Sequence, residues 1–337
     1  MAIGVAAPVA SLDEWIDRGD LDELIRECDR LCERRDWPGL ARLRDRARDA
    51  FDRGHQLWPA AAQADYRLAL EAPAEWAVPA VETGAGQFTL GPLTEVVAST
   101  HTWDDMADHL TDSRIAALIA HERVVRGEEL EGDVSIDRTV LDLPLQLAGW
   151  EDPYAVATYQ AHRVEAPAPR LPPPGPMADL PDPGGRADDP DAVSALVDLA
   201  ATWATDSNGR VEAVAVEGDA VAAVSALGPT RASVDRVPTA TASALMGWTA
   251  ASGGAFGRRR GAAAGRFGAW WAMAALTDLL DDWPVTAGEL GAAVDEMAWF
   301  VWSVGEPETG WHCRLAAHDP SHGLAWALAA ADGGGEG

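Results

Sequence analysis

A segment dense in proline divides this chain of 337 residues into two parts with different patterns. Nine prolines lie between Glu165 and Asp191, together with Gly184, Gly185 and several acidic residues. Proline at this density removes backbone donors and favours extended polyproline geometry. The sequence therefore predicts a semi-rigid linker over residues 165–191. The alternative is that the prolines form a ligand for an aromatic-lined domain.

The part before this segment has the spacing of amphipathic helices. Apolar residues from Leu21 to Cys32 recur at intervals of three and four, and Asp20 with Glu23 resembles a capping box at their start. Trp-Pro pairs at 37–38 and 58–59 are typical of helix starts, and a further apolar stripe runs through 114–126. These patterns predict an all-α domain over residues 1–164.

Tryptophans recur in this helical part with steps of about twenty residues, the length of one helix and its turn. They occupy positions 15, 37, 58, 76 and 103. This spacing indicates stacked helices, as in a short helical repeat, although the full signature of no named repeat is present.

The part after the linker mixes helical and strand patterns, which predicts an α+β domain over residues 192–332. Helices are expected at 191–205, 240–280 and 284–294, and strands at 298–304 and 311–318. Alternating runs around Gly218-Asp219 favour a β-hairpin over 211–227. Residues 323–331 fit a helix or a strand, and 333–337 are expected to be a flexible tail. The fold class is thus mainly α with a smaller α+β part, in which a small mixed sheet packs on helices.

The chain contains no lysine, since all 26 of its basic side chains are arginine. P-loop nucleotide sites and protein kinases need a lysine on the phosphates, and pyridoxal enzymes and Schiff-base aldolases need a lysine amine. Arginine replaces none of these because it stays protonated. Lysine-dependent chemistry is therefore excluded.

The formal net charge of -28 argues against nucleic acid and anionic membranes as partners, because nucleic-acid affinity comes mainly from cationic side chains. Codon bias in a high-GC genome explains the arginine, alanine and proline content, and a halophilic source is the alternative explanation for the acidity. The longest apolar stretch, 267–280, is interrupted by Asp278 and predicts a buried helix rather than a membrane span.

Three cysteines, Cys28, Cys32 and Cys313, form no disulfide framework, which indicates a reducing compartment. The first ten residues lack the basic start of a signal peptide, so we expect a cytoplasmic protein. Cys28 and Cys32 share the apolar face of one predicted helix and are expected to be packing residues. A zinc site would need two more ligands, and His55 is the one nearby candidate, so we expect no metal and no cofactor.

The segment Ser252 to Trp271 combines four glycines at intervals of four residues with a cluster of arginines. On a helix, Gly253, Gly257, Gly261 and Gly265 would form one bare stripe, but glycine is costly inside helices, so part of the segment is alternatively a loop. The arginines are Arg258, Arg259, Arg260 and Arg266. They predict either ion pairs within an acidic protein, a site for a phosphate or carboxylate ligand, or a docking surface for an acidic partner.

A second cluster lies in the predicted strand 311–318. Alternation would place His312, Arg314 and His318 on one face of that strand. These residues are expected to be either a solvated polar face or, beside the anchoring Arg314, histidines for acid/base work near neutral pH. Pairs of acids such as Asp188-Asp189 and Asp281-Asp282 are interpreted as solvated surface charge.

These observations lead to two hypotheses of different classes. The first is a non-enzymatic cytoplasmic interaction protein, with a protein partner and the helical domain as its scaffold. The alternative is an enzyme or ligand sensor whose C-terminal domain binds a small anion. Its ligand would be held by Arg258, Arg259, Arg260, Arg266, Arg314, His312 and His318.

Overall fold

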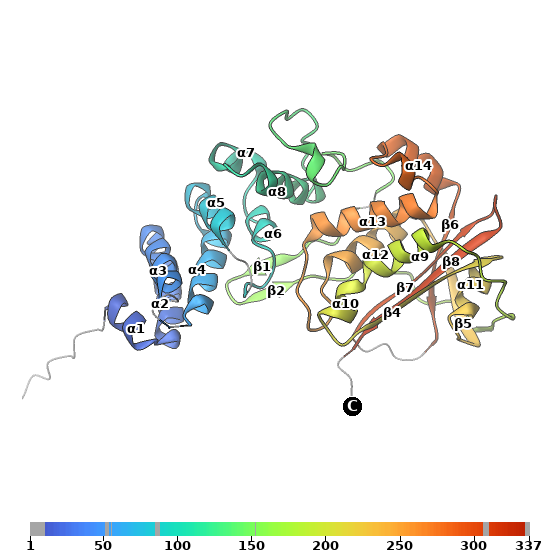
Figure 1. Cartoon of the computed structure of the whole chain (residues 1–337), viewed down its shortest axis with the longest axis horizontal. Coiled ribbons are helices and arrows are strands. Elements are labelled where there is room, and N and C mark those ends of the chain that lie inside the picture. Colours follow the sequence, from blue (N-terminus) through green and yellow to red (C-terminus); the bar gives the residue numbers. More distant parts are fainter. Residues whose placement is uncertain are drawn as a thin grey trace, which may run out of the picture. The chain divides into compact units, whose positions relative to one another are not determined.

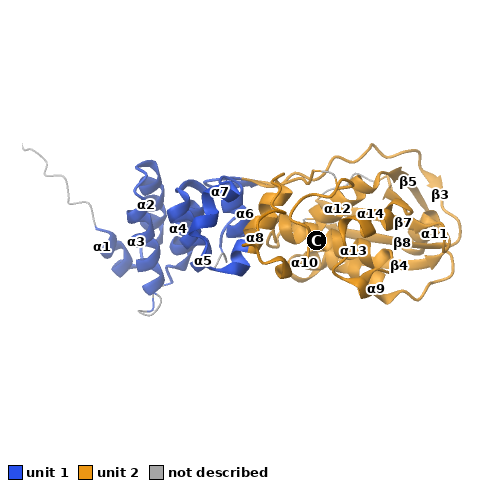
Figure 2. Cartoon of the chain, turned by 90° about the horizontal axis from the view of Figure 1, so that it is seen from above, with its two compact units in different colours: residues 1–116, 159–164 blue, residues 117–158, 165–337 orange. Residues whose placement is uncertain are grey.

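The computed structural model describes residues 11–50, 54, 56–84, 88–151, 153–305 and 310–333. The chain divides into two compact units (Figure 2). Unit 1 comprises residues 1–116 and 159–164, and unit 2 comprises residues 117–158 and 165–337. The described elements are mainly helices, with a smaller β component in unit 2, which confirms the predicted fold class.

Unit 1 is built from a succession of short helices (Figure 1). They are α1 (Leu12–Arg18), α2 (Leu21–Glu33), α3 (Trp37–Asp49), α4 (Trp58–Glu71), α5 (Ala74–Thr83), α6 (Leu93–Ala98), α7 (Trp103–Met106) and the 3-10 turn η2 (Ala107–His109). Helix α8 (Ser113–Val125) crosses the boundary between the units. The strands β1 (Thr158–Gln160) and β2 (Arg163–Glu165) form a separate two-stranded sheet.

The predicted helix starts in unit 1 are confirmed. The Asp20 side chain accepts the backbone N–H of Glu23 at the start of α2, and Asp36 caps α3 in the same way. Trp37 and Trp58 are the first residues of α3 and α4, each followed by proline. Local capping chemistry therefore sets the boundaries of these helices.

Consecutive helices of unit 1 pack on one another around a shared core. Ile16, Leu24, Leu40, Leu43 and Leu68 are fully buried in it. Cys28 and Cys32 lie in the same cluster and are free thiols, which confirms their prediction as packing residues. His55, the candidate for completing a zinc site, lies outside the described residues.

Unit 2 contains a six-stranded sheet and six α-helices of its own within the described residues. The helices are α9 (Pro190–Leu199), α10 (Ala201–Thr205), α11 (Ala220–Ala226), α12 (Thr239–Ala251), α13 (Ala262–Leu276) and α14 (Ala287–Asp295), with 3-10 turns η3 (Arg138–Val140) and η4 (Leu280–Asp282). The strands are β3 (Ala178–Asp179), β4 (Arg210–Glu217), β5 (Arg231–Val237), β6 (Ala298–Ser303), β7 (Trp311–Asp319) and β8 (Leu324–Asp332).

The sheet has the order β3-β5-β6-β7-β8-β4, and all its strand pairs are antiparallel, so the prediction of a mixed sheet is wrong. Antiparallel pairing follows because β6, β7 and β8 are joined by short connections that reverse the chain. Helices α9 and α12 pack on one face of the sheet and α13 packs on these two helices, and Trp270, Trp299 and Leu328 lie in the main core that they share (Figure 1). Helix α11 packs on the other face.

Several predicted elements differ in the structure. Residues 220–226 form helix α11 instead of the second strand of a hairpin, because Asp219 accepts the backbone N–H of Ala222 as an N-cap and the alanine-rich segment favours a helix. The predicted helix 191–205 is two helices, α9 and α10, and 240–280 is α12 and α13 with a loop between them. The ambiguous segment 323–331 is strand β8.

The compact units divide the chain differently from the expected domains. Residues 117–158 group with unit 2 because they supply polar partners to its helices: Trp150 donates to the carbonyl of Ala287, and Glu122 accepts the backbone N–H of Ala263. The proline-rich segment 165–191 also belongs to unit 2, where β3 pairs with β5. Of the expected tail, residues 334–337 lie outside the described residues.

Within the described residues, no helix is both long enough and apolar enough to cross a bilayer. Helix α13, which contains most of the apolar stretch 267–280, is a core helix of unit 2.

Candidate functional site

Arg266, one of the predicted anion ligands, is a buried structural residue. Its side chain is fully buried and forms an ion pair with Glu151 at 2.8 Å. It also donates to the carbonyls of Pro144 and Gln146, both at 2.8 Å. These contacts leave no route for an external ligand, so the ion-pair interpretation of the sequence holds for this residue.

The four glycines do not form one helical stripe. Gly253 and Gly257 lie in the loop between α12 and α13, and Gly261 is the N-cap of α13 with φ 101°. Gly265 is inside α13 and faces α12, where a Cβ would lie 2.3 Å from the carbonyl oxygen of Gly247. The glycine spacing therefore serves a close helix contact at one position and a loop at the others.

Arg258, Arg259 and Arg260 lie in that same loop. Arg258 and Arg260 are exposed and Arg259 is half-buried. None of them lines either of the two cavities described below, so the structure does not bring the predicted arginines together with Arg314.

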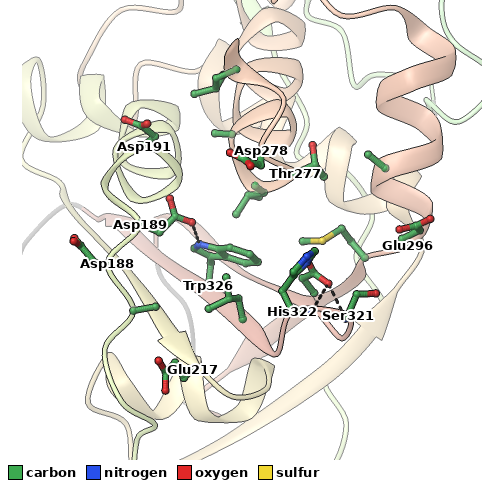
Figure 3. Close-up of a pocket in the computed structure, with 18 of the residues that line it drawn as sticks. Asp188, Asp189, Asp191, Glu217, Thr277, Asp278, Glu296, Ser321, His322 and Trp326 are labelled. Carbon is green, nitrogen blue, oxygen red and sulfur yellow. Dashed lines mark hydrogen bonds and ion pairs between the residues drawn. The ribbon is translucent and has the colours of Figure 1, made fainter. Parts of the chain in front are cut away.

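Unit 2 contains a cleft of about 810 Å³, which we call the acidic cleft (Figure 3). It lies where β4 ends, β7 turns into β8, α9 begins and α13 ends. Eight carboxylates line it: Asp188, Asp189, Asp191, Glu217, Asp278, Asp281, Glu296 and Asp319. Figure 3 shows Asp191 and Glu296 on opposite sides of the hollow, so the negative charge surrounds it.

Most of these carboxylates have no ion pair with the part of the chain that the structure describes. Of the eight carboxylates, Asp319 alone forms an ion pair in the described part of the chain, with His322 at 2.6 Å. Arg186 is the other cation among the described lining residues. Like charges that surround a concave surface focus the potential and attract counter-ions of opposite sign. The cleft is therefore a strongly negative concavity.

Hydrogen bonding fixes the charges at the β7–β8 turn. Burial opposes the charge on Asp319, but the hydrogen bonds from His322 and the backbone N–H of Ser321 outweigh it and hold the pKa of Asp319 below its ordinary value. The hydrogen bond to Asp319 in turn raises the pKa of His322. His322 thus pairs directly with Asp319, and the charges of Asp278 and Glu296 raise its pKa further.

The floor of the cleft is apolar. Trp326, Leu276 and Met297 are buried beneath it, with exposed fractions of 3%, 3% and 6%. The indole N–H of Trp326 donates to Asp189 at 2.8 Å, so Asp189 is held while it also caps α9 (Figure 3). Within the described residues, no three metal-ligating side chains converge as a metal ion would require. Such a surface suits an extended cation with an aliphatic part.

The second cavity lies at the other predicted cluster and has a volume of about 350 Å³. Strand β7 forms as predicted, and His312 and Arg314 both line this cavity. His318 is on the same strand but does not line it, and lies opposite Ala298 and Ala325 in the sheet. The structure therefore brings together two of the seven predicted ligand residues.

Sequence reasoning misses the acidic cleft because its carboxylates come from five separate stretches of the chain. In the sequence, Asp188 and Asp189 are interpreted as solvated surface acids, and the cleft forms only when folding brings them near Asp278 and Glu296. No local pattern marks such a site.

The chain belongs to a family of unknown function, DUF6183, whose profile matches residues 22–334. The match covers most of both units. Searches among curated proteins and among solved structures found no match to this chain.

Proposed function

We propose that this protein acts by binding rather than catalysis, and that the acidic cleft of unit 2 holds a positively charged segment of a partner protein. The observation that carries the proposal is the ring of eight carboxylates around an apolar floor, one of them in an ion pair within the described residues.

The shape and chemistry of the cleft suit arginine and lysine side chains. These side chains have an aliphatic stem and a charged end, so the stem can lie on Leu276, Met297 and Trp326 while the cation faces the carboxylates. A volume of about 810 Å³ holds more than a single ion. The overall charge of -28 would also steer a basic partner toward the protein.

The helical unit is, in this proposal, the scaffold. Its consecutive helices pack on their neighbours along the chain, as in extended helical binding proteins. A cytoplasmic location is part of the same proposal. The free thiols of Cys28, Cys32 and Cys313 support it, because reducing compartments keep thiols unpaired.

Binding of a fluorescently labelled hexa-arginine peptide to the full chain tests this function. A protein of this charge attracts any polycation, so the comparison must keep net charge constant. The cleft variant is Asp188→Asn, Glu217→Gln and Asp278→Asn combined. The matched control neutralises three exposed acids of unit 1, Asp17→Asn, Glu33→Gln and Asp49→Asn.

The proposal predicts that the cleft variant binds the peptide about tenfold or more weakly, while the control stays within about twofold of the wild type. Added salt should weaken binding to the wild type because most of the contacts are exposed charges. If the two variants lose the same amount of affinity for the peptide, the proposal is refuted, because the peptide would then be attracted by the overall negative charge and not by the cleft.

A further inference from the structure

The proline-rich segment between β2 and β3 has an extended backbone. Residues 166–177 form neither helix, strand nor turn, and six of them are prolines. Each proline fixes its own φ at about −65° and holds the residue before it in extended conformations. Together these restraints favour the left-handed polyproline helix, which has three residues per turn and no internal hydrogen bonds.

The period of three residues divides this segment into an inner and an outer edge. Leu171 and Pro174 line the second cavity of unit 2, and Met177, three residues further on, lies beside Gly305. These contacts form the inner edge. The outer edge, which is exposed at every position and does not line the cavity, consists of Pro167, Arg170, Pro173 and Pro176.

The segment is held in place on the sheet. The backbone N–H of Gly175 donates to the Asp235 carboxylate of β5 at 2.9 Å, and this close approach leaves no room for a Cβ at residue 175. Strand β3, which follows the segment directly, pairs with β5. Because the prolines and these contacts already order the segment, a partner that binds it has little conformational entropy to remove.

The outer edge combines proline rings with one positive charge. Pro173 and Pro176 have the spacing of a P-x-x-P motif, and domains that bind this motif hold the prolines in grooves lined by aromatic side chains. Arg170 lies one turn earlier on the same edge. It is exposed, and no ion pair joins it to the part of the chain that the structure describes. An acidic residue at one end of such a groove would pair with this guanidinium.

We propose that the outer edge is the docking surface for an SH3-type domain of a partner protein, with proline pockets for Pro173 and Pro176 and an acidic residue for Arg170. Pro172, which is exposed next to this edge, is also within reach of such a groove. The surface is separate from the acidic cleft, and the inference goes beyond the function proposed for that cleft and does not depend on it.

Titration of isotope-labelled SH3 domains with the unlabelled full chain, followed by NMR, tests the inference. The probes are purified SH3 domains whose peptide ligands carry an arginine three residues before a P-x-x-P motif. Salt at about 0.15 M screens the long-range repulsion that the charge of -28 exerts on an acidic groove. We expect saturable shifts confined to the groove residues of at least one domain at concentrations of the full chain below about 1 mM.

Three variants assign the contacts to one edge of the segment. Arg170→Ala and Pro173→Ala each remove a contact of the outer edge and should weaken binding about tenfold. Pro174→Ala is the matched control, because it loosens the backbone as Pro173→Ala does but removes a ring from the inner edge. Its affinity should stay within about twofold of the wild type.

Loss of folding would not explain such a difference. Arg170, Pro173 and Pro174 are all exposed, so each variant should melt within a few degrees of the wild type. The proposal is overturned if none of these SH3 domains binds the wild type through its groove. It is also overturned if Pro173→Ala and Pro174→Ala weaken binding equally, because the domain would then not recognise the outer edge.

Discussion

Arg266 and Glu151 form a two-pronged ion pair in the interior of unit 2. The Nε and Nη2 atoms of Arg266 each lie 2.8 Å from one carboxylate oxygen of Glu151, and both side chains are fully buried. Trp270 and Tyr154 also donate to this carboxylate. Although burial opposes the charge, the hydrogen bonds from Arg266 and its neighbours keep the pKa of Glu151 below its ordinary value.

Replacement of Arg266 should therefore be strongly destabilising. Arg266→Met leaves a buried carboxylate without its cation and should lower the free energy of unfolding by about 3–5 kcal/mol. Urea denaturation measures this change. Arg231→Met, which breaks an exposed pair with Asp179, should cost less than about 1 kcal/mol. Similar losses in both variants would contradict the structural role of Arg266.

Two glycine substitutions in helices should have opposite signs. Gly288 lies in α14 with open space where a Cβ would be, so Gly288→Ala should stabilise the protein by up to about 1 kcal/mol. Gly265→Ala places its Cβ against the backbone of α12 and should cost about 1–3 kcal/mol despite the same gain in helix propensity. Thermal unfolding of both variants separates the effect of packing from that of helix propensity. A higher melting temperature for Gly265→Ala than for the wild type would disprove the close helix contact.

His121 should make unit 2 sensitive to acid. It is fully buried, and neither ring nitrogen has a hydrogen-bond partner among the described residues. Burial, assisted by the charge of Arg266, lowers its pKa to about 4. Between its unfolded pKa near 6.5 and this value, the unfolded state binds a proton that the folded state does not, so stability falls as pH falls. The decrease in the free energy of unfolding caused by His121 should reach about 2 kcal/mol at pH 5.

Substitution of His121 isolates this contribution from that of the many carboxylates. His121→Leu should be at least as stable as the wild type at pH 7, because an unpaired polar group is removed. The difference in the free energy of unfolding between His121→Leu and the wild type should increase by about 2 kcal/mol as the pH falls from 7 to 5. Parallel pH profiles for the two proteins would show that His121 does not titrate as the structure indicates.

The three thiols should be inert in the folded protein. Cys28 and Cys313 have no exposed surface and Cys32 is 5% exposed. Burial raises the pKa of Cys32 and of Cys313 to about 12, so little of either is the reactive thiolate. A thiol reagent should label none of the three at neutral pH and all three in denaturant. Fast labelling of native Cys32 would place it outside the core of unit 1.

Much of the fold follows from local sequence signals. Asp20 and Asp36 cap helices where the pattern predicts them, and strands β6 and β7 form where alternation is regular. The prediction fails at 220–226, where a valine- and alanine-rich run fits both helix and strand, and the cap at Asp219 selects the helix. The proline content predicts a spacer over 165–191, and no local signal predicts that β3 in this segment pairs with β5, about fifty residues away.

The sites are less visible in the sequence than the fold. Alternation along β7 predicts that His312 and Arg314 lie on one face, and both line the second cavity of unit 2. The arginine-rich segment predicts an anion site that would include Arg266. In the structure Arg266 is paired with Glu151, which lies 115 residues away in the sequence and is not part of any local pattern.

Cross-linking of a basic peptide to the wild-type protein tests the central claim, binding in the acidic cleft, most directly. A hexa-arginine peptide with a photoreactive group at its centre is bound to the full chain, irradiated and mapped by mass spectrometry. The account predicts cross-links concentrated at residues 186–191, 275–281 and 319–326, which surround the cleft. Cross-links spread over the acidic surface, or gathered on unit 1, would contradict it.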